Sequence, residues 1–156
     1  MSISTDPQLL AKELKSNKVL IMAGQLCEEV DFGNKTLSDY VVEISNKLDA
    51  PIAATGNTPI PLKERGAKSV RKMFANEVVN YMRWPWEDPV IDSKPEMLLL
   101  IGYGPSTAQG LTSSVSDGAK TMVLGSTYVK TASYSLPESS SFNQWKQYLE
   151  EIISAL

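Results

Sequence analysis

The residues best suited to chemistry follow directly after short apolar runs of the sequence. Two groups stand out: Thr55, Gly56 and Asn57 at the end of the run 51–56, and Gly102, Tyr103 and Gly104 at the end of the run 97–102. A hydroxyl or an amide can bind phosphate, ribose or base, and glycine lets backbone N–H groups approach a nucleotide closely. Together with Gly24, which ends an earlier apolar run, these residues are the candidate cofactor-binding residues.

The second group is a partial match to the dinucleotide-binding pattern GxGxxG, because Thr107 stands where the third glycine is expected. Gly102 and Gly104 would still let a phosphate approach the start of the following helix. Alternatively, both glycines only turn the chain, and Asn57 is only a turn residue before a proline. Both interpretations stay open at this point.

The absence of histidine and the single cysteine, Cys27, exclude several kinds of site within this chain. A four-cysteine iron–sulfur cluster, a zinc site of Cys/His type and an internal disulfide cannot form. A Ser-His-Asp triad and a histidine general base are excluded as well. We therefore expect no catalytic residues and no metal held by this chain. Cys27 has no histidine or nearby lysine in sequence to activate it, so we interpret it as a small structural residue.

Two further segments have polar or aromatic residues that invite a function. Glu28, Glu29 and Asp31 form a short acidic run, which we interpret as a solvated loop rather than a Mg²⁺ site. Trp84 and Trp86 flank a proline, and they either plug the core or anchor a protein interface. Both interpretations of the tryptophans stay open.

Four apolar runs that each end in glycine predict the strands that position these residues. The runs are 18–24, 51–56, 97–102 and 120–125, and a fifth strand is expected over 131–136. None of the four alternates apolar with polar residues, which is typical of parallel strands covered on both faces. The sequence therefore predicts an α/β fold: a three-layer, doubly wound parallel sheet of Rossmann-like type, in one domain over 1–156. In such sheets ligands bind beyond the carboxyl ends of the strands, where these glycines lie.

Helical spacing of apolar residues predicts helices between the strands. The stripes are Leu37, Tyr40, Val41, Ile44 and Leu48; Val70, Met73, Phe74, Val78 and Tyr81; and Phe142, Trp145, Leu149, Ile152 and Ile153. Helix starts are indicated at Asp6-Pro7, at Thr36 with Asp39, at Pro105, and at Ser141 with Gln144.

Length and charge narrow the class of protein. The chain has 156 residues, of which 42% are hydrophobic and 21% charged, so it can bury a sizeable core. Its net charge of −3, without a basic tail, argues against a nucleic-acid partner. No apolar run is long enough to span a membrane, and no signal peptide is evident. We expect a soluble, cytoplasmic protein.

The stretch from Val19 to Thr58 resembles the epsilon subunit of the archaeal CO dehydrogenase/acetyl-CoA decarbonylase-synthase complex. The resemblance is carried by Met22 and Gly24 in an M-x-G ending, by Val42, Ile44, Ser45 and Lys47 in V-x-I-S-x-K, and by "PIAATG" at 51–56. Two segments depart from the family pattern: "WEDPVIDSKPE" at 86–96 replaces a Gly/Asp-rich loop, and Tyr103-Gly104-Pro105 replaces a Phe-Lys-Lys sequence.

The resemblance implies a fold like the NAD/FAD-binding fold of deoxyhypusine synthase. It also implies an accessory subunit that binds the large Ni/Fe–S CO dehydrogenase (alpha) subunit, in the one-carbon metabolism and methanogenesis of archaea. The implied roles are to stabilise that subunit and to help electrons reach FAD, which makes FAD the candidate cofactor. A homo-oligomer is also compatible with the resemblance. No catalytic residue is implied.

A second hypothesis is a stand-alone electron-transfer module that binds FAD or NAD at the glycine-rich loops. It and the accessory-subunit hypothesis can both hold. An independent enzyme on the same fold is disfavoured, because a deacylase of this fold needs a histidine base that the chain lacks.

Overall fold

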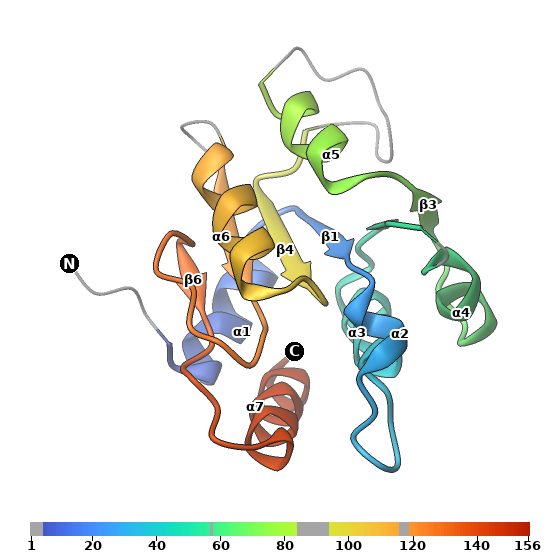
Figure 1. Ribbon diagram of the computed structural model, residues 1–156, viewed down its shortest axis with the longest axis vertical. Helices are drawn as coiled ribbons and strands as arrows, with labels where there is room; N and C mark the ends of the chain where they lie inside the picture. Colours follow the sequence, from blue (N-terminus) through green and yellow to red (C-terminus); the bar gives the residue numbers. More distant parts are fainter. Residues whose placement is uncertain (1–4, 57, 84–93, 116–118) are drawn as a thin grey trace.

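The core of the protein is a parallel sheet of six strands (Figure 1). The computed structural model describes residues 5–56, 58–83, 94–115 and 119–156. The strands are β1 (Val19–Ala23), β2 (Ile52–Ala54), β3 (Val70–Lys72), β4 (Met97–Ile101), β5 (Lys120–Val123) and β6 (Tyr134–Ser135). They lie in the order β3-β2-β1-β4-β5-β6, the strand order of a Rossmann fold. The predicted fold class is confirmed.

The burial of the two central strands on both faces explains why their sequences do not alternate apolar with polar residues. β1 and β4 pair in parallel from Val19 opposite Met97 to Ala23 opposite Ile101. All five residues of each strand are buried, because helices cover both faces of the sheet.

Helices cover the sheet from two sides. They are α1 (Pro7–Ser16), α2 (Leu26–Glu29), α3 (Leu37–Leu48), α4 (Pro59–Glu64), α5 (Ala75–Tyr81), α6 (Pro105–Ser114) and α7 (Phe142–Ala155). Apolar residues of α1, α3 and α7 pack on one face of the sheet, and those of α5 and α6 pack on the other. In Figure 1, α6 lies in front of β4, while the fainter α1 and α3 lie behind the sheet. The chain is therefore wound on both faces, as predicted.

The predicted helix starts are confirmed by their caps. The Thr36 hydroxyl accepts the N–H of Asp39 while the Asp39 carboxylate accepts the N–H of Thr36, which is a complete capping box. The Asp6 side chain caps α1, and the Ser141 hydroxyl accepts the N–H of Gln144 at the start of α7.

The stretch 70–74 differs from the prediction of a continuous helix. Val70 to Lys72 form the edge strand β3, with Val70 opposite Ile52, and Phe74 is 61% exposed. Residues 70–72 pair with the edge of β2, and this pairing prevailed over the helical spacing of their apolar residues. The helix therefore begins only at Ala75. At the other edge, only Tyr134 and Ser135 of the predicted strand 131–136 pair with β5. The short helix α4, which starts at Pro59, was not predicted.

Across the ranges that the structure describes, no helix is both long enough and apolar enough to cross a membrane.

Candidate functional site

The carboxyl ends of β1 and β4 form the switch point of the sheet. The chain leaves β1 toward β2 on one side and leaves β4 toward β5 on the other, so the two loops diverge there. This is the place at which open parallel sheets bind ligands. The predicted residues after β1, β2 and β4 therefore meet at one edge.

Gly24 and Gly102 let the two loops touch. The N–H of Gly24 donates to the carbonyl of Ile101 at 2.8 Å, and the N–H of Leu26 donates to the carbonyl of Gly102 at 2.9 Å. A Cβ on Gly24 would lie 2.4 Å from that carbonyl oxygen, and one on Gly102, whose φ is +90°, would lie 2.5 Å from the Cys27 Sγ. Both positions therefore need glycine for the close approach of the backbone.

A first cleft lies on the β2 side of this contact, and we call it the α6 cleft. Its volume is about 390 Å³. It is lined by Gln25, Leu26, Glu29, Thr55, Gly102, Tyr103, Gly104 and Thr107. Four of the predicted cofactor-binding residues thus come together: Thr55, Gly102, Tyr103 and Gly104.

Of the other three predicted residues, the two that the structure describes, Gly24 and Gly56, do not line this cleft. Gly24 is buried against Gly102. Gly56 is exposed in a turn with a φ of +58°, which glycine adopts without strain. Asn57 lies outside the described residues. For Gly24 and Gly56, a turn or a close approach of the backbone accounts for the glycine without a ligand.

The N-terminus of α6 opens at the α6 cleft. Gly104 is its N-cap residue and supplies no side-chain cap, and Pro105 at the first helical position has no N–H. The following backbone N–H groups, beginning at Ser106, carry the positive end of the helix dipole and suit an anion. Among the described residues that line the cleft, Glu29 is the only charged one. Its carboxylate disfavours an anion, so any affinity for phosphate must come from the backbone N–H groups and from the hydroxyls of Thr55 and Thr107.

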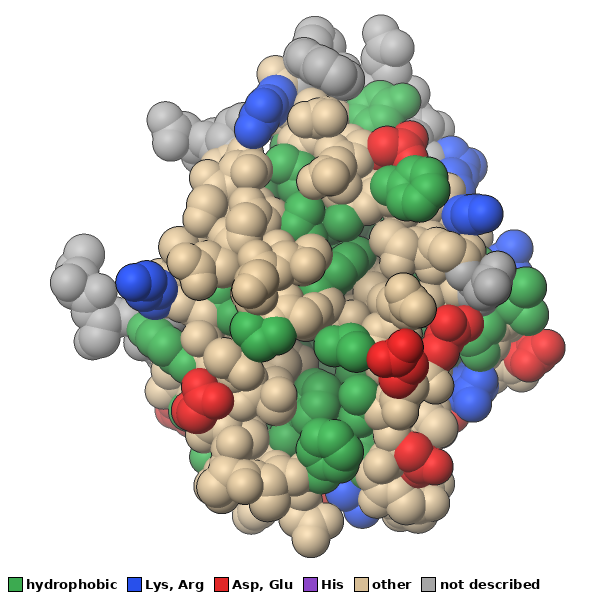
Figure 2. Space-filling model, in the orientation of Figure 1, with side chains coloured by type: hydrophobic (Ala, Val, Ile, Leu, Met, Phe, Trp, Pro, Cys, Tyr) green, Lys and Arg blue, Asp and Glu red, His purple; other side chains and the backbone are tan. Residues whose placement is uncertain are grey.

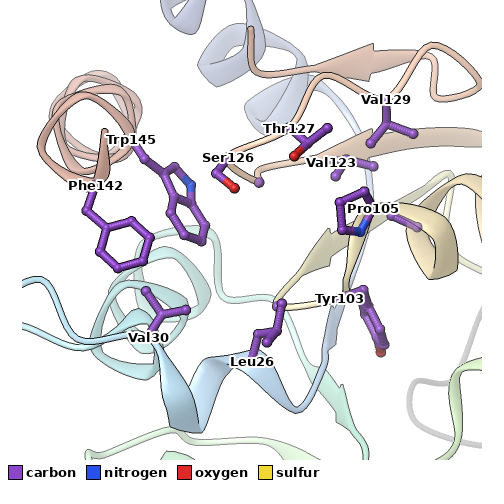
Figure 3. A pocket seen from close by; sticks show the side chains of 13 residues that line it. Leu26, Val30, Tyr103, Pro105, Val123, Ser126, Thr127, Val129, Phe142 and Trp145 are labelled. Atoms are coloured by element: carbon purple, nitrogen blue, oxygen red, sulfur yellow. The ribbon is translucent and has the colours of Figure 1, made fainter. Parts of the chain in front are cut away.

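A second cleft lies on the β5 side of the same loop, and we call it the Phe142 cleft. Its volume is about 230 Å³. It is lined by Leu26, Val30, Gly102, Tyr103, Pro105, Ala108, Val123, Gly125, Ser126, Thr127, Val129, Phe142 and Trp145. Figure 3 shows these side chains around a common space, with Phe142 and Trp145 from α7 facing Pro105 and Tyr103 across it. The lining is mostly apolar, with the hydroxyls of Ser126 and Thr127 as its polar groups.

Aromatic packing holds the α7 wall of the Phe142 cleft. The rings of Phe32 and Trp145 meet edge to face at 5.2 Å, and Phe32 meets Phe142 in the same way at 5.9 Å. The indole N–H of Trp145 donates to the carbonyl of Leu124 at 3.4 Å. Trp145 is buried, whereas Phe142 is 57% exposed.

The exposure of Phe142 was not predicted, because the residue belongs to the same apolar stripe as Trp145 and Leu149. It is the first residue of α7, so its ring packs on Phe32 at the rim and not under the sheet. The signal available in sequence is its position directly after the capping residue Ser141.

Two groups between the clefts have a raised pKa. Burial raises the pKa of the Cys27 thiol to about 12, and its Sγ lies 3.4 Å from the carbonyl of Ile101. The interpretation of Cys27 as a structural residue is therefore supported. Burial also raises the pKa of Tyr103, whose hydroxyl has no hydrogen-bond partner among the described residues. That hydroxyl points away from the Phe142 cleft in Figure 3.

An acidic rim adjoins the apolar lining. Glu28, Glu29 and Asp31 are exposed. In the chain, the two glutamates lie between the cleft residues Leu26 and Val30, and the aspartate directly follows Val30. Figure 2 shows red carboxylates directly beside a hollowed apolar patch on this face. Within the described ranges, no group of three or more His, Cys, Asp or Glu side chains is placed to hold a metal ion. The predicted pair Trp84 and Trp86 lies outside the described residues.

Comparison with known proteins bears on the family. The chain matches no protein-family model. It is 27% identical over 160 residues to the acetyl-CoA decarbonylase/synthase complex subunit epsilon 1 of Methanosarcina barkeri (strain Fusaro / DSM 804), an alignment that covers 99% of this chain and 89% of that protein. The chain is therefore similar to this epsilon subunit along nearly its whole length. The resemblance predicted from residues 19–58 is thereby confirmed, and it extends along the whole chain.

Among solved structures, the D-arabinose dehydrogenase from Sulfolobus solfataricus matches with a TM-score of 0.47 and 12% sequence identity. The match covers 96% of this chain and 46% of that one, so this chain spans less than half of the dehydrogenase. The fold assignment rests on the strand order and not on this match.

Proposed function

We propose that the chain is a non-catalytic accessory subunit of a CO dehydrogenase/acetyl-CoA decarbonylase-synthase complex. In this proposal it binds the large Ni/Fe–S CO dehydrogenase (alpha) subunit and stabilises it. The observation that carries the proposal is the alignment with the epsilon subunit over 99% of the chain.

The chemistry of the chain agrees with a supporting role. Cys27 is the only cysteine, it is buried, and its raised pKa keeps the thiol protonated at neutral pH. In a complex of this kind, the metal clusters would be held by the other subunits.

A contribution to electron transfer through FAD is the second part of the proposal. The open N-terminus of α6, with the hydroxyls of Thr55 and Thr107 beside it, fits the pyrophosphate of a dinucleotide. The adjoining Phe142 cleft, at about 230 Å³, is smaller than the pockets that usually hold cofactors, so we do not place the flavin ring in it. Bound FAD would supply electron transfer, and this chain would supply the backbone donors for its pyrophosphate. Glu29 is the feature that does not fit, because it faces the phosphate position with a negative charge.

The same features favour the alternative of a stand-alone FAD- or NAD-binding electron-transfer module. The two functions differ in their need for a partner, since the module would bind flavin alone and in stoichiometric amount.

The experiment is co-expression of the chain with the large Ni/Fe–S subunit of the same organism, followed by size-exclusion chromatography and an absorbance spectrum. We expect the two chains to elute together and the CO-oxidising activity of the large subunit to survive heating longer than it does alone. Separate elution at micromolar concentration would refute the accessory-subunit proposal. Stoichiometric flavin on the lone chain would support the electron-transfer module.

A further inference from the structure

The Phe142 cleft has the size and lining of a site for one large apolar side chain. Its volume is about 230 Å³. Pockets for cofactors and other small molecules usually occupy about 300–1,000 Å³, whereas an apolar cavity of about 150 Å³ already accepts a benzene ring. Among the described side chains that line it, the hydroxyls of Ser126 and Thr127 offer polar contacts, since the indole N–H of Trp145 is bonded to Leu124. Such a site recognises shape and apolar area more than hydrogen bonds.

The rim has the composition of a binding surface. Phe142 keeps 57% of its surface exposed although it lies in an aromatic cluster with Phe32 and Trp145. An aromatic residue that is held in place and still exposed loses little conformational freedom on binding, which is typical of residues that dominate interface energies.

The charges around the cleft define the partner further. Glu28, Glu29 and Asp31 are exposed on the α2 side. The lysine nearest to them in sequence, Lys35, is bonded to Glu43 at 2.6 Å and lies over the ring of Tyr40. The rim is therefore acidic on this side, and it would steer a basic segment to the cleft.

Resting on the proposed function, we infer that the Phe142 cleft receives a segment of the larger partner subunit, in which one aromatic or long aliphatic side chain is flanked by Lys or Arg. The apolar side chain fills the space between α7, α2 and the loop after β4. The flanking cations lie against the carboxylates of α2 and Asp31.

Two exposed phenylalanines provide a matched test of the surface. Phe142 is 57% exposed and Phe74 is 61% exposed, but Phe74 lies at the start of α5 and lines neither cleft. We expect Phe142→Asp to weaken binding to the large subunit at least about tenfold, and Phe74→Asp to change it less than about twofold. Ser126→Phe, which fills the cleft from its rim, is expected to weaken binding as Phe142→Asp does. Thermal unfolding of each variant confirms that it is folded.

The charge part of the inference has a test that needs no partner subunit. Acetylated and amidated tripeptides Lys-Phe-Arg and Glu-Phe-Glu are titrated into the isotope-labelled chain and followed by NMR. We expect Lys-Phe-Arg to shift the methyl signals of Leu26 and Val30, and to bind at least about threefold more tightly than Glu-Phe-Glu.

The outcomes separate this inference from the proposed function. If the wild-type chain binds the large subunit and Phe142→Asp binds equally well, the cleft is not the contact, although the accessory role stands. If the wild-type chain does not bind the large subunit, the proposed function fails, and with it the assignment of the occupant to that subunit. The tripeptides then decide the chemistry of the cleft: shifts at the cleft with the basic peptide would support an apolar side chain flanked by cations, and no shift, or a preference for the acidic peptide, would overturn it.

Discussion

The two clefts beside the loop after β4 share a wall and both contact α6, but among the described residues α7 lines the Phe142 cleft and not the α6 cleft. The α6 cleft meets a helix whose N-cap residue, Gly104, offers no side chain to its free N–H groups. The Phe142 cleft meets α7, where the Ser141 hydroxyl already accepts the N–H of Gln144. The N-terminus of α6 therefore has no side-chain cap where an anion can bind, whereas the N-terminus of α7 is capped where the apolar Phe142 is exposed. One sheet edge thus presents two chemically different surfaces, and each variant below tests one side of that difference.

The largest effect is expected at the shared wall, from Gly102→Ala. The new Cβ would lie 2.5 Å from the Cys27 Sγ and 3.0 Å from the carbonyl of Gly24, at a φ of +90°. We expect a loss of roughly 2 to 5 kcal/mol in the free energy of unfolding, from backbone strain and overpacking together. Urea unfolding followed by circular dichroism measures it.

Gly104→Ala is the matched control two residues away. A Cβ there meets nothing within 4 Å, so its cost should stay below about 1 kcal/mol. Equal costs for the two variants would show that the loops after β1 and β4 do not touch as described.

Cys27, behind the same wall, makes stability depend on pH. Burial raises its pKa from 9.0 to about 12 in the folded protein, so the unfolded chain loses the thiol proton first as the pH rises. The contribution of the buried, protonated thiol to the free energy of unfolding is therefore fully present below pH 9, and it declines between about pH 9 and 12. From pH 8 to 10 the wild type should lose about 1.4 kcal/mol more of its unfolding free energy than Cys27→Ala, whose other titrating groups are the same. Parallel pH profiles for the two proteins would contradict the burial of the thiol.

The sequence could predict the central strands and the helix caps because their signals are local. The runs that became β1 and β4 are apolar at every position, and the capping pair of Thr36 and Asp39 is three residues apart. β3 could not be predicted, because Arg71 and Lys72 carry no strand pattern and only the neighbouring β2 makes them extended. A continuous helix over 70–81 accounted for the apolar positions as well as a strand followed by a helix did.

The α6 cleft was partly predictable and the Phe142 cleft was not. Gly102 and Gly104 lie together in sequence, and the rule for parallel sheets brings Thr55 to the same edge. The walls of the Phe142 cleft come from elements that are distant in the chain, among them α2, α6, β5 and α7. No spacing rule links Leu26 to Phe142, and the stripe in α7 does not distinguish a rim residue from a buried one.

In the Phe142 cleft, Ser141→Ala tests how much the N-terminal cap of α7 stabilises the helix that carries Phe142 and Trp145. Removing the hydroxyl that accepts the N–H of Gln144 should cost about 1 kcal/mol of unfolding free energy. Ser113→Ala is the control, since that exposed hydroxyl only bonds the carbonyl of Gln109 within α6, and we expect a change below about 0.5 kcal/mol. A similar loss in both variants would mean that the cap of α7 contributes nothing particular to this wall.

The smallest change in stability, and the sharpest test of the difference between the clefts, is expected from Gly104→Ser. Gly104 has the extended backbone of an N-cap residue, so a serine hydroxyl there would accept one of the N–H groups that α6 leaves free. The unfolding free energy should rise by a few tenths of a kcal/mol, about the difference between glycine and serine at this position.

ADP, titrated calorimetrically as a probe of the α6 cleft, should bind severalfold more weakly because the serine competes for the same donors. Gly104→Ala adds a methyl group without a competing acceptor and should bind ADP as the wild type does. If Gly104→Ser binds ADP as tightly as the wild type, or if the wild type does not bind ADP, the N-terminus of α6 is not an anion site. The Phe142 cleft would then be the remaining candidate site at this edge of the sheet.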